Sequence, residues 1–195
     1  MRLSPHRTAL ERWLQRRTPV PGFRGLDIGS ARHRGAPLGP GWLSLDITPT
    51  RDVVQGDLRF LPFRPGSFDA LRCVATLHLV GELRESLCEF ASVLRPGGRL
   101  ILTYLMAYEA GENESSVRPT PGAWRELLAA AGFKPLVIEP LDGALGVLAQ
   151  VIYSAGYRSR FCRMLAAILV RWDRPGGQWT TGYGIVAERL SGSHT

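Results

Sequence analysis

The chain has 195 residues, 45% hydrophobic and 21% charged, which is the composition of an ordinary globular protein of one domain. Its net charge of +7 rests on arginine, because the chain contains a single lysine. A positive charge of this size can attract nucleic acid, anionic lipid or an acidic substrate. It can equally reflect a coding sequence that favours arginine codons. No apolar run approaches the roughly 20 residues that span a bilayer, so we expect no membrane-spanning helix, although attachment to a membrane surface stays open.

The cysteines and the first residues bear on the cellular compartment. Cys73, Cys88 and Cys162 are widely spaced and lack the pairing of a zinc or redox motif, so we expect no metal site and free thiols in a reducing environment. The polar, basic start lacks the apolar core of a secretion signal. We therefore predict a cytoplasmic protein, with attachment to the inner face of the membrane as the alternative.

Hydrophobic periodicity predicts alternating helices and strands. Segment 5–17 places its apolar residues on one helical face and its arginines elsewhere, and this helix either packs on the sheet edge or binds a membrane or partner. Strands are then expected at 24–28, 42–47, 52–55, 68–75, 99–105, 133–139 and 182–189, and helices at 81–94 and 120–132. The turn Pro96-Gly97-Gly98 is expected to end helix 81–94. Strands alternating with helices indicate an α/β protein with a doubly wound parallel sheet.

Three apolar runs end in aspartate. Asp27 is followed by Gly29, Asp46 is followed by a turn, and Asp57 is introduced by Gly56. Ligands of open parallel sheets bind outside the carboxyl ends of the strands, where an acidic side chain can accept hydrogen bonds from a nucleoside. Glycine lets the backbone approach such a ligand closely. We interpret the three aspartates as one nucleoside-binding rim, against the alternative that each is a turn or capping residue.

Three longer motifs carry a family resemblance. They are GDLRFLPF at 56–63 followed by GSFDA at 66–70, VLRPGGRL at 93–100, and PGAWRELL at 121–128. With these motifs in this order, the chain resembles the class I S-adenosylmethionine-dependent methyltransferases, and among them the small-molecule branch of the methyltransferase type 11 kind. The resemblance covers residues 25–141 and the closing strand. It implies one Rossmann-like sheet of about seven mostly parallel strands with an antiparallel last strand.

The resemblance implies that S-adenosyl-L-methionine is the cofactor, and it assigns the contacts by position. The loop that begins at Asp27 supports the methionine part, Asp46 binds the ribose hydroxyls, and Asp57 with the backbone of Leu58 binds adenine. The backbone of Ala75, at the end of the fourth strand, faces the amino group. The residues assigned to the cofactor in this way are Asp27, Gly29, Ser30, Ala31, Asp46, Ile47, Asp57, Leu58 and Ala75.

The first glycine-rich loop departs from the family. Relatives have Gly-x-Gly-x-Gly, whereas this chain has Ala31 at the second glycine and Arg32-His33 after it. The glycines and prolines in 35–41 predict that the customary helix between the first two strands is absent or very short. We hypothesise that Arg32 or Arg34 binds the cofactor carboxylate in place of that helix N-terminus, the alternative being that both are exposed to solvent.

His78 is the leading candidate for a general base, because it lies where the fourth strand opens into the expected active site. A structural role for this histidine is the alternative. A base favours O-methylation over N-methylation, since an amine needs only to be neutral. Three residues at or after the end of the fifth strand are candidates for orienting the acceptor: Tyr104, Tyr108 and Glu109. The alternatives are that Tyr104 belongs to the core and that Tyr108 and Glu109 lie in a mobile loop.

Residues 142–176 exceed the short hairpin that joins the last two strands in the plain fold. They are predicted to form two helices, 144–155 and 159–172, rich in large apolar residues and arginine. One hypothesis is a cap over the acceptor pocket or a homodimer interface, and the other is a surface for a membrane or a lipid-linked acceptor. The predicted regions are an N-terminal helix (1–22), a cofactor-binding core (23–141), this helical insertion (142–176) and a closing strand (177–190).

The predicted function is methyl transfer to a small-molecule or lipid- or glycan-linked acceptor, more readily to oxygen than to nitrogen. One alternative is a binding protein that keeps the fold with little or no activity, prompted by the altered loop after Gly29. The charge prompts a third hypothesis, a nucleic-acid methyltransferase. Against it, the fourth strand ends in Cys73-Val74-Ala75-Thr76 and not in the Asn/Asp-Pro-Pro-aromatic run of base-amino methyltransferases.

Overall fold

The computed structural model describes residues 5–17, 24–29, 38, 40–48, 51–105, 119–156, 159–176 and 180–191. The chain divides into two compact units. The helical unit comprises Met1–Thr18, Leu105–Glu114 and Glu139–Gly184, and the sheet unit comprises Pro19–Tyr104, Ser115–Ile138 and Ile185–Thr195. The chain passes from one unit to the other within a β-strand at residues 104–105, 138–139 and 184–185.

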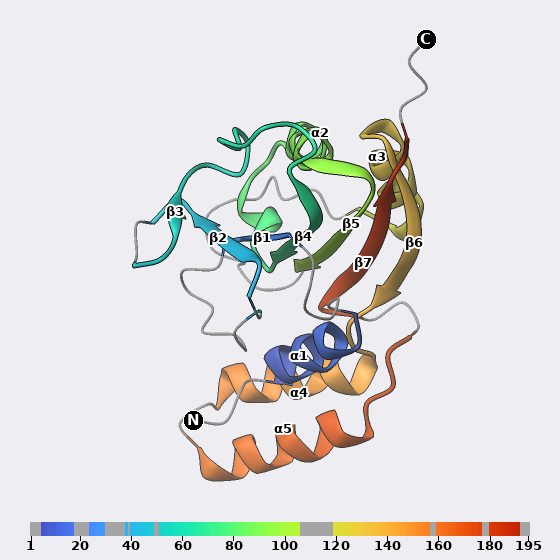
Figure 1. The fold of residues 1–195 in the computed structure, drawn as a ribbon. Coiled ribbons are helices and arrows are strands. Elements are labelled where there is room, and N and C mark those ends of the chain that lie inside the picture. Colours follow the sequence, from blue (N-terminus) through green and yellow to red (C-terminus); the bar gives the residue numbers. More distant parts are fainter. Residues whose placement is uncertain are drawn as a thin grey trace. The chain divides into compact units, whose positions relative to one another are not determined.

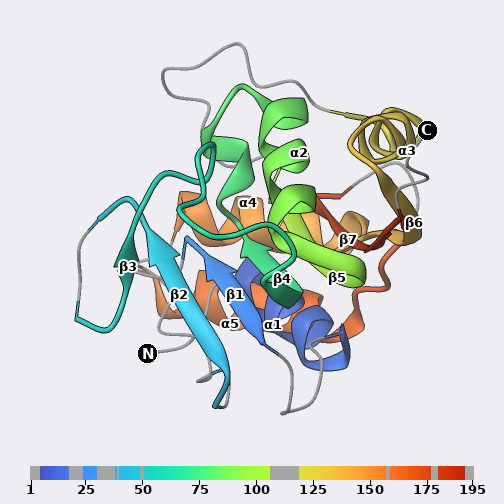
Figure 2. The same ribbon diagram turned by 45° about the horizontal axis from the view of Figure 1, so that its top comes forward.

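Seven strands form one sheet in the order β3-β2-β1-β4-β5-β7-β6 (Figure 2). Strands β3, β2, β1, β4 and β5 are parallel, and β7 is antiparallel to its neighbours β5 and β6. The predicted α/β sheet of seven mostly parallel strands with an antiparallel last strand is therefore confirmed. The strands are β1 (Gly25–Ile28), β2 (Trp42–Asp46), β3 (Val54–Gln55), β4 (Phe68–Val74), β5 (Leu94–Leu105), β6 (Phe133–Pro140) and β7 (Gly182–Arg189).

The centre of the sheet is built from strands without polar alternation. All four residues of β1 are buried, and five of the seven residues of β4 are buried. On β5, the four residues from Leu100 to Thr103 are completely buried. Near-continuous apolar runs are typical of parallel strands that are covered on both faces, because neither face meets water.

Two helices and a short 3-10 turn belong to the sheet unit: η1 (Leu77–Leu79), α2 (Leu83–Val93) and α3 (Pro121–Ala130). Helix α2 buries its apolar side chains at helical spacing, and it packs against α3. Helix α3 begins where Thr120 accepts a hydrogen bond from the Ala123 N–H at 3.2 Å, with proline at the first helical position.

The turn Pro96-Gly97-Gly98 was expected to end helix 81–94, and this expectation is wrong. Helix α2 ends at Val93, and Leu94 already pairs with Phe68 of β4. The pairing then shifts, because Ala70 pairs with Arg99. The proline and glycines are therefore an irregularity inside β5, where Gly97 has a φ of 75° that an L side chain rarely adopts.

The helical unit contains α1 (Pro5–Arg17), α4 (Ala144–Ala155) and α5 (Arg160–Trp172), which pack against one another (Figure 1). Helices α4 and α5 lie between β6 and β7, as predicted for the insertion. Their contact is built on Ala149, Ala166 and Val170, and small residues here let the two helices approach closely. Among the described residues, no helix combines the length and apolar character that crossing a membrane requires.

Candidate functional site at the carboxyl edge of the sheet

The register of the strands brings the predicted cofactor residues to one edge. Ile28, the last residue of β1, pairs with Leu45 of β2 and with Cys73 of β4. Asp46 ends β2 opposite Gln55, which ends β3. The segments that follow these four strands therefore leave the sheet from the same edge, the edge at which open α/β sheets bind their ligands.

Gly29 joins the ends of three of these strands. Its N–H donates to the carbonyl oxygen of Leu45 at 2.8 Å, and its φ is 77°. A Cβ at this position would lie 2.0 Å from Oγ1 of Thr76, in the segment after β4. Only glycine fits, because any side chain would be both strained at this φ and too close to Thr76.

Ala75 is the second unusual residue at this edge. Its φ is 49°, in the left-handed region that non-glycine residues seldom occupy. The Ala75 N–H donates to Oγ1 of the buried Thr103 on β5 at 2.9 Å, which holds this conformation in place. Strained backbone of this kind concentrates at ligand-binding sites, where the surrounding structure maintains it.

Asp46 is held at the end of β2 by its own turn. Its Oδ1 accepts the N–H of Thr48 at 2.8 Å, and its carbonyl oxygen accepts the N–H of Gly56 at 3.0 Å. The first bond is an Asx turn, which orients the carboxylate, and the second fixes the segment after β3 beside it. The carboxylate is half-buried, and the adjacent Ile47 is exposed.

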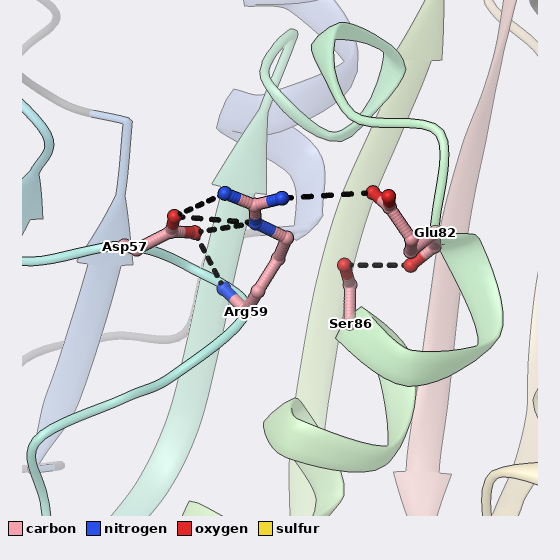
Figure 3. Close-up of polar contacts among 4 residues, drawn as sticks. All are labelled: Asp57, Arg59, Glu82 and Ser86. Atoms are coloured by element: carbon pink, nitrogen blue, oxygen red, sulfur yellow. Dashed lines mark hydrogen bonds and ion pairs between the residues drawn. The ribbon is translucent and has the colours of Figure 1, made fainter.

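Asp57 is bonded to Arg59 (Figure 3). Its carboxylate accepts the backbone N–H of Arg59 at 2.9 Å, and Nη2 of Arg59 donates to Oδ2 at 2.7 Å. Nη1 of Arg59 lies 4.0 Å from Oε2 of Glu82, the residue before α2. The side-chain hydrogen bond from Arg59 lowers the pKa of Asp57, so this carboxylate is ionised at neutral pH. The next residue, Leu58, is buried.

The carboxylate of Asp27 points at a charged partner on the neighbouring strand. Arg72 lies directly opposite Asp27 on β4, and its Nε and Nη2 donate to the two carboxylate oxygens at 2.8 and 2.9 Å. The side chains are only 9% and 13% exposed. Arg72 was not among the predicted residues, although a lone arginine within the apolar run of β4 was the available signal.

His78 lies in η1, directly beyond the end of β4, and is partly buried. Its ring meets the ring of Tyr104 edge to face with a centroid distance of 6.3 Å, and Tyr104 meets Trp124 of α3 in the same way at 5.1 Å. Tyr104 is 2% exposed, and this burial raises the pKa of its hydroxyl. Tyr104 therefore has the core position that the sequence left as an alternative, and its ring pairs edge to face with that of His78.

Several predicted residues lie outside the described part of the chain. They are Ser30, Ala31, Arg32, His33, Arg34, Tyr108 and Glu109. Most of the stretch 35–41, where the customary helix was expected to be absent, also falls outside it. The predictions for these residues stay predictions.

Comparisons with known proteins match a part of the chain that includes residues of this edge. Residues 29–102 match the family described as methyltransferase domain. Demethylmenaquinone methyltransferase of Renibacterium salmoninarum is 33% identical over 43% of this chain and 41% of its own length. Fatty-acid O-methyltransferase of Mycolicibacterium smegmatis is 31% identical over 52% of this chain and 36% of its own length. The chain thus spans less than half the length of these two relatives.

Solved structures share the fold. The crystal structure of 1,6-didemethyltoxoflavin-N1-methyltransferase of Burkholderia thailandensis, with bound 1,6-didemethyltoxoflavin and S-adenosylhomocysteine, covers 96% of this chain and 79% of that chain. Its TM-score is 0.59 at 15% identity, which is a likeness of fold. The family match starts at Gly29 and includes Asp46, Asp57 and Ala75. Residues 29–102 of this chain therefore match a methyltransferase domain of the class I, S-adenosylmethionine-dependent kind, type 11.

Proposed function

We propose that this protein transfers a methyl group from S-adenosylmethionine to a lipid-type or small organic acceptor. One observation carries the proposal: Gly29, Asp46 and Ala75, which the family match covers, lie at or just beyond strand ends that meet at one edge of the sheet. The acceptor class is taken from the relatives, which are named for demethylmenaquinone and for fatty acids. The regions 23–141 and 142–176 are proposed to serve cofactor binding and acceptor or surface binding respectively.

The residues at the edge suit a nucleoside with a sulfonium side chain. Gly29 lets the segments after β1 and β4 lie in close contact, because a Cβ here would fall 2.0 Å from Oγ1 of Thr76. The Asp46 carboxylate, oriented by its Asx turn, can accept hydrogen bonds from two ribose hydroxyls. Asp57, kept ionised by Arg59, can accept one from the adenine amino group. The Ala75 backbone, held by Thr103, is proposed to face the methionine amino group.

The reaction needs alignment more than acid–base chemistry. When bound, the cofactor supplies an electrophilic methyl group whose transfer removes the positive charge from sulfur. The protein contributes by holding donor and acceptor in line and by excluding water from the reacting centre. For a hydroxyl acceptor, His78 is proposed as the general base, because it lies in η1, three residues after Ala75 and just beyond the end of β4. The His78 ring meets the ring of Tyr104 edge to face.

The cofactor site is tested with Asp46→Ala. We expect the affinity for S-adenosylhomocysteine to fall about 10- to 100-fold, since a charge-assisted hydrogen bond contributes roughly 1.5–3 kcal/mol. Isothermal titration calorimetry measures this directly. Asp52→Ala, at an exposed aspartate away from the strand ends, is the matched control and keeps the wild-type affinity. Wild-type protein that binds no S-adenosylhomocysteine at millimolar concentration would contradict the proposal and favour a binding protein without methyltransferase activity.

The role of His78 is tested with His78→Gln. For a hydroxyl acceptor we expect kcat to fall about 100-fold, because general-base catalysis contributes on this scale, while the affinity for S-adenosylhomocysteine is unchanged. Transfer of a radioactive methyl group into the extracted acceptor gives kcat, and calorimetry gives the affinity. An unchanged kcat with a hydroxyl acceptor would leave His78 a structural residue.

A further inference from the structure

Helix α5 carries an exposed apolar stripe along its whole length. Phe161, Met164, Ile168 and Trp172 are 65%, 52%, 47% and 72% exposed. Their spacing of three, four and four residues places them on one face of the helix. We call these four residues the α5 stripe. Large side chains exposed singly are ordinary, but four in a continuous row indicate a surface that binds something.

The stripe is separate from the face by which α5 packs on the helical unit. Ala166 and Val170 are buried against Ala149 of α4, and they lie on the side of α5 opposite to Ile168. Helix α5 is thus apolar on two sides, and only one of them is used by the described fold. A helix that is apolar on two sides usually has both covered, because exposed apolar area is unfavourable in water.

The charges beside the stripe are all positive. Arg160 and Arg171 are exposed and follow the edge of the stripe, four residues before Met164 and three residues after Ile168. Arg174 is exposed just beyond the helix. The sequence from 144 to 176 contains one acidic residue, Asp173, and its carboxylate accepts the N–H of Gly143 at 2.9 Å. Nothing acidic on α5 itself balances these arginines.

We propose that the α5 stripe docks this protein on a bilayer that contains anionic lipid. The helix would lie in the plane of the interface, with the stripe among the acyl chains and the arginines at the headgroup phosphates. The charges favour this occupant over a second copy of the chain. A symmetric pair of α5 helices would bring arginines against arginines with no acid between them, and like charges at an interface are unfavourable.

The proposal goes beyond the methyl-transfer reaction, and its test uses no methyl donor. The full chain is mixed with vesicles of phosphatidylcholine containing 30% phosphatidylglycerol (about one lipid in three), a composition that supplies the anionic headgroups. Flotation in a density gradient then gives the bound fraction. We expect binding to these vesicles, at least tenfold weaker binding to pure phosphatidylcholine, and loss of binding as the salt concentration rises.

Two variants locate the contact. Phe161→Ser with Trp172→Ser is expected to weaken binding more than tenfold, whereas Phe60→Ser, at an exposed phenylalanine of the sheet unit, leaves it unchanged. Arg160→Gln with Arg171→Gln is expected to remove the preference for anionic vesicles, and Arg84→Gln with Arg99→Gln is its matched control. These side chains are exposed, so the variants should keep the circular dichroism spectrum and the affinity for S-adenosylhomocysteine of the wild type.

Three results would overturn the proposal. They are absence of vesicle binding by the wild type, equal binding by the stripe variant, and equal binding to both kinds of vesicle. A wild-type dimer that the stripe variant converts to a monomer, seen by sedimentation velocity without lipid, would assign the stripe to a second copy. Failure of the methyl-transfer proposal is recognised separately, by the absence of S-adenosylhomocysteine binding in calorimetry.

Discussion

Two residues at the carboxyl edge have backbone conformations that most residues avoid. Gly29 and Ala75 both have positive φ, and they follow strands that pair side by side in the sheet. Each is held by a bond to a neighbouring strand, from Gly29 to Leu45 and from Ala75 to Thr103. Positive φ at two adjacent strand ends turns both segments sharply, and strained backbone of this kind clusters at ligand-binding sites.

The close contact between Gly29 and Thr76 is tested with Gly29→Ala, and Gly97→Ala is the control. Both glycines have φ near 75°, at 77° and 75°, but an added Cβ meets Thr76 only at position 29 and nothing within 4 Å at position 97. We expect Gly97→Ala to lower the free energy of unfolding by about 1–2 kcal/mol through backbone strain alone. Gly29→Ala should lower it further, by the additional clash, in urea denaturation.

The same pair of variants reports on the site. Gly29→Ala should also abolish measurable binding of S-adenosylhomocysteine, whereas Gly97→Ala should leave it unchanged. Equal losses of stability in the two variants would mean that the segment after β4 moves away freely from Gly29. The close approach would then have no role in shaping the edge.

Arg59 shows how one side chain prepares another for binding. It contacts Asp57 through both its backbone N–H and its guanidinium, and it extends toward Glu82 at the start of α2. Because the side-chain hydrogen bond from Arg59 lowers the pKa of Asp57, its carboxylate is ionised at neutral pH, as the proposed adenine contact requires. The pair is partly exposed to solvent, and we expect it to orient Asp57 more than it stabilises the fold.

Among the elements, β1 and β4 are joined by a buried ion pair as well as by their backbone ladder. Asp27 and Arg72 are directly opposite each other, and the guanidinium spans both carboxylate oxygens. Burial removes both groups from water, so each depends on the other for its hydrogen bonds. The pair thus bridges β1 and β4 one residue before the carboxyl end of β1.

Arg72→Met tests this coupling between the two strands. We expect it to lower the free energy of unfolding by roughly 3–5 kcal/mol, because it leaves the Asp27 carboxylate buried without its cation. The double variant Asp27→Leu with Arg72→Met should recover most of that loss, since no unpaired charge remains. Urea denaturation of the two variants and the wild type gives both values. A double variant no more stable than Arg72→Met would show that the two side chains do not act as a pair.

Calorimetry on the same variants separates two roles of Asp27. If its carboxylate also contacts the cofactor, as the family resemblance implies, the stable double variant binds S-adenosylhomocysteine more weakly than the wild type. If the carboxylate serves only Arg72, the double variant binds as tightly as the wild type. The affinity of the double variant therefore decides whether Asp27 belongs to the cofactor site.

For the whole molecule, the two proposals meet in the presentation of the acceptor. Under the two proposals, the acceptor is of the lipid type for which the relatives are named, and the α5 stripe binds the membrane in which such an acceptor dissolves. A protein bound to the bilayer meets an embedded acceptor at a much higher local concentration than a protein in solution.

We therefore expect kcat/KM for a lipid quinone or fatty acid to be at least tenfold higher in vesicles with anionic lipid than in vesicles without it. Transfer of a radioactive methyl group into the extracted lipid measures the rate. The stripe variant should lose this stimulation, while Phe60→Ser should keep it. The same stimulation with the stripe variant would disconnect the surface from catalysis, even if the surface binds vesicles.

Most elements of the fold could be predicted from the sequence, because their periodicity is local. The bounds of α1, α4 and β7 agree with the prediction to the residue, and the aspartates at 27, 46 and 57 were placed correctly at or just beyond strand ends. The turn Pro96-Gly97-Gly98 was misassigned, since proline and glycine end a helix and interrupt a strand alike. Only pairing with β4 distinguishes these cases.

What the sequence determined by itself was the order of the elements and the family motif, because both depend on residues close together in the chain. The tertiary structure decided which side chains the aspartates meet. Arg72 is 45 residues from Asp27, and only the register of β1 against β4 places them together. It also decided that one apolar face of α5 is packed and the other exposed, since periodicity describes both faces alike and only the position of α4 distinguishes them.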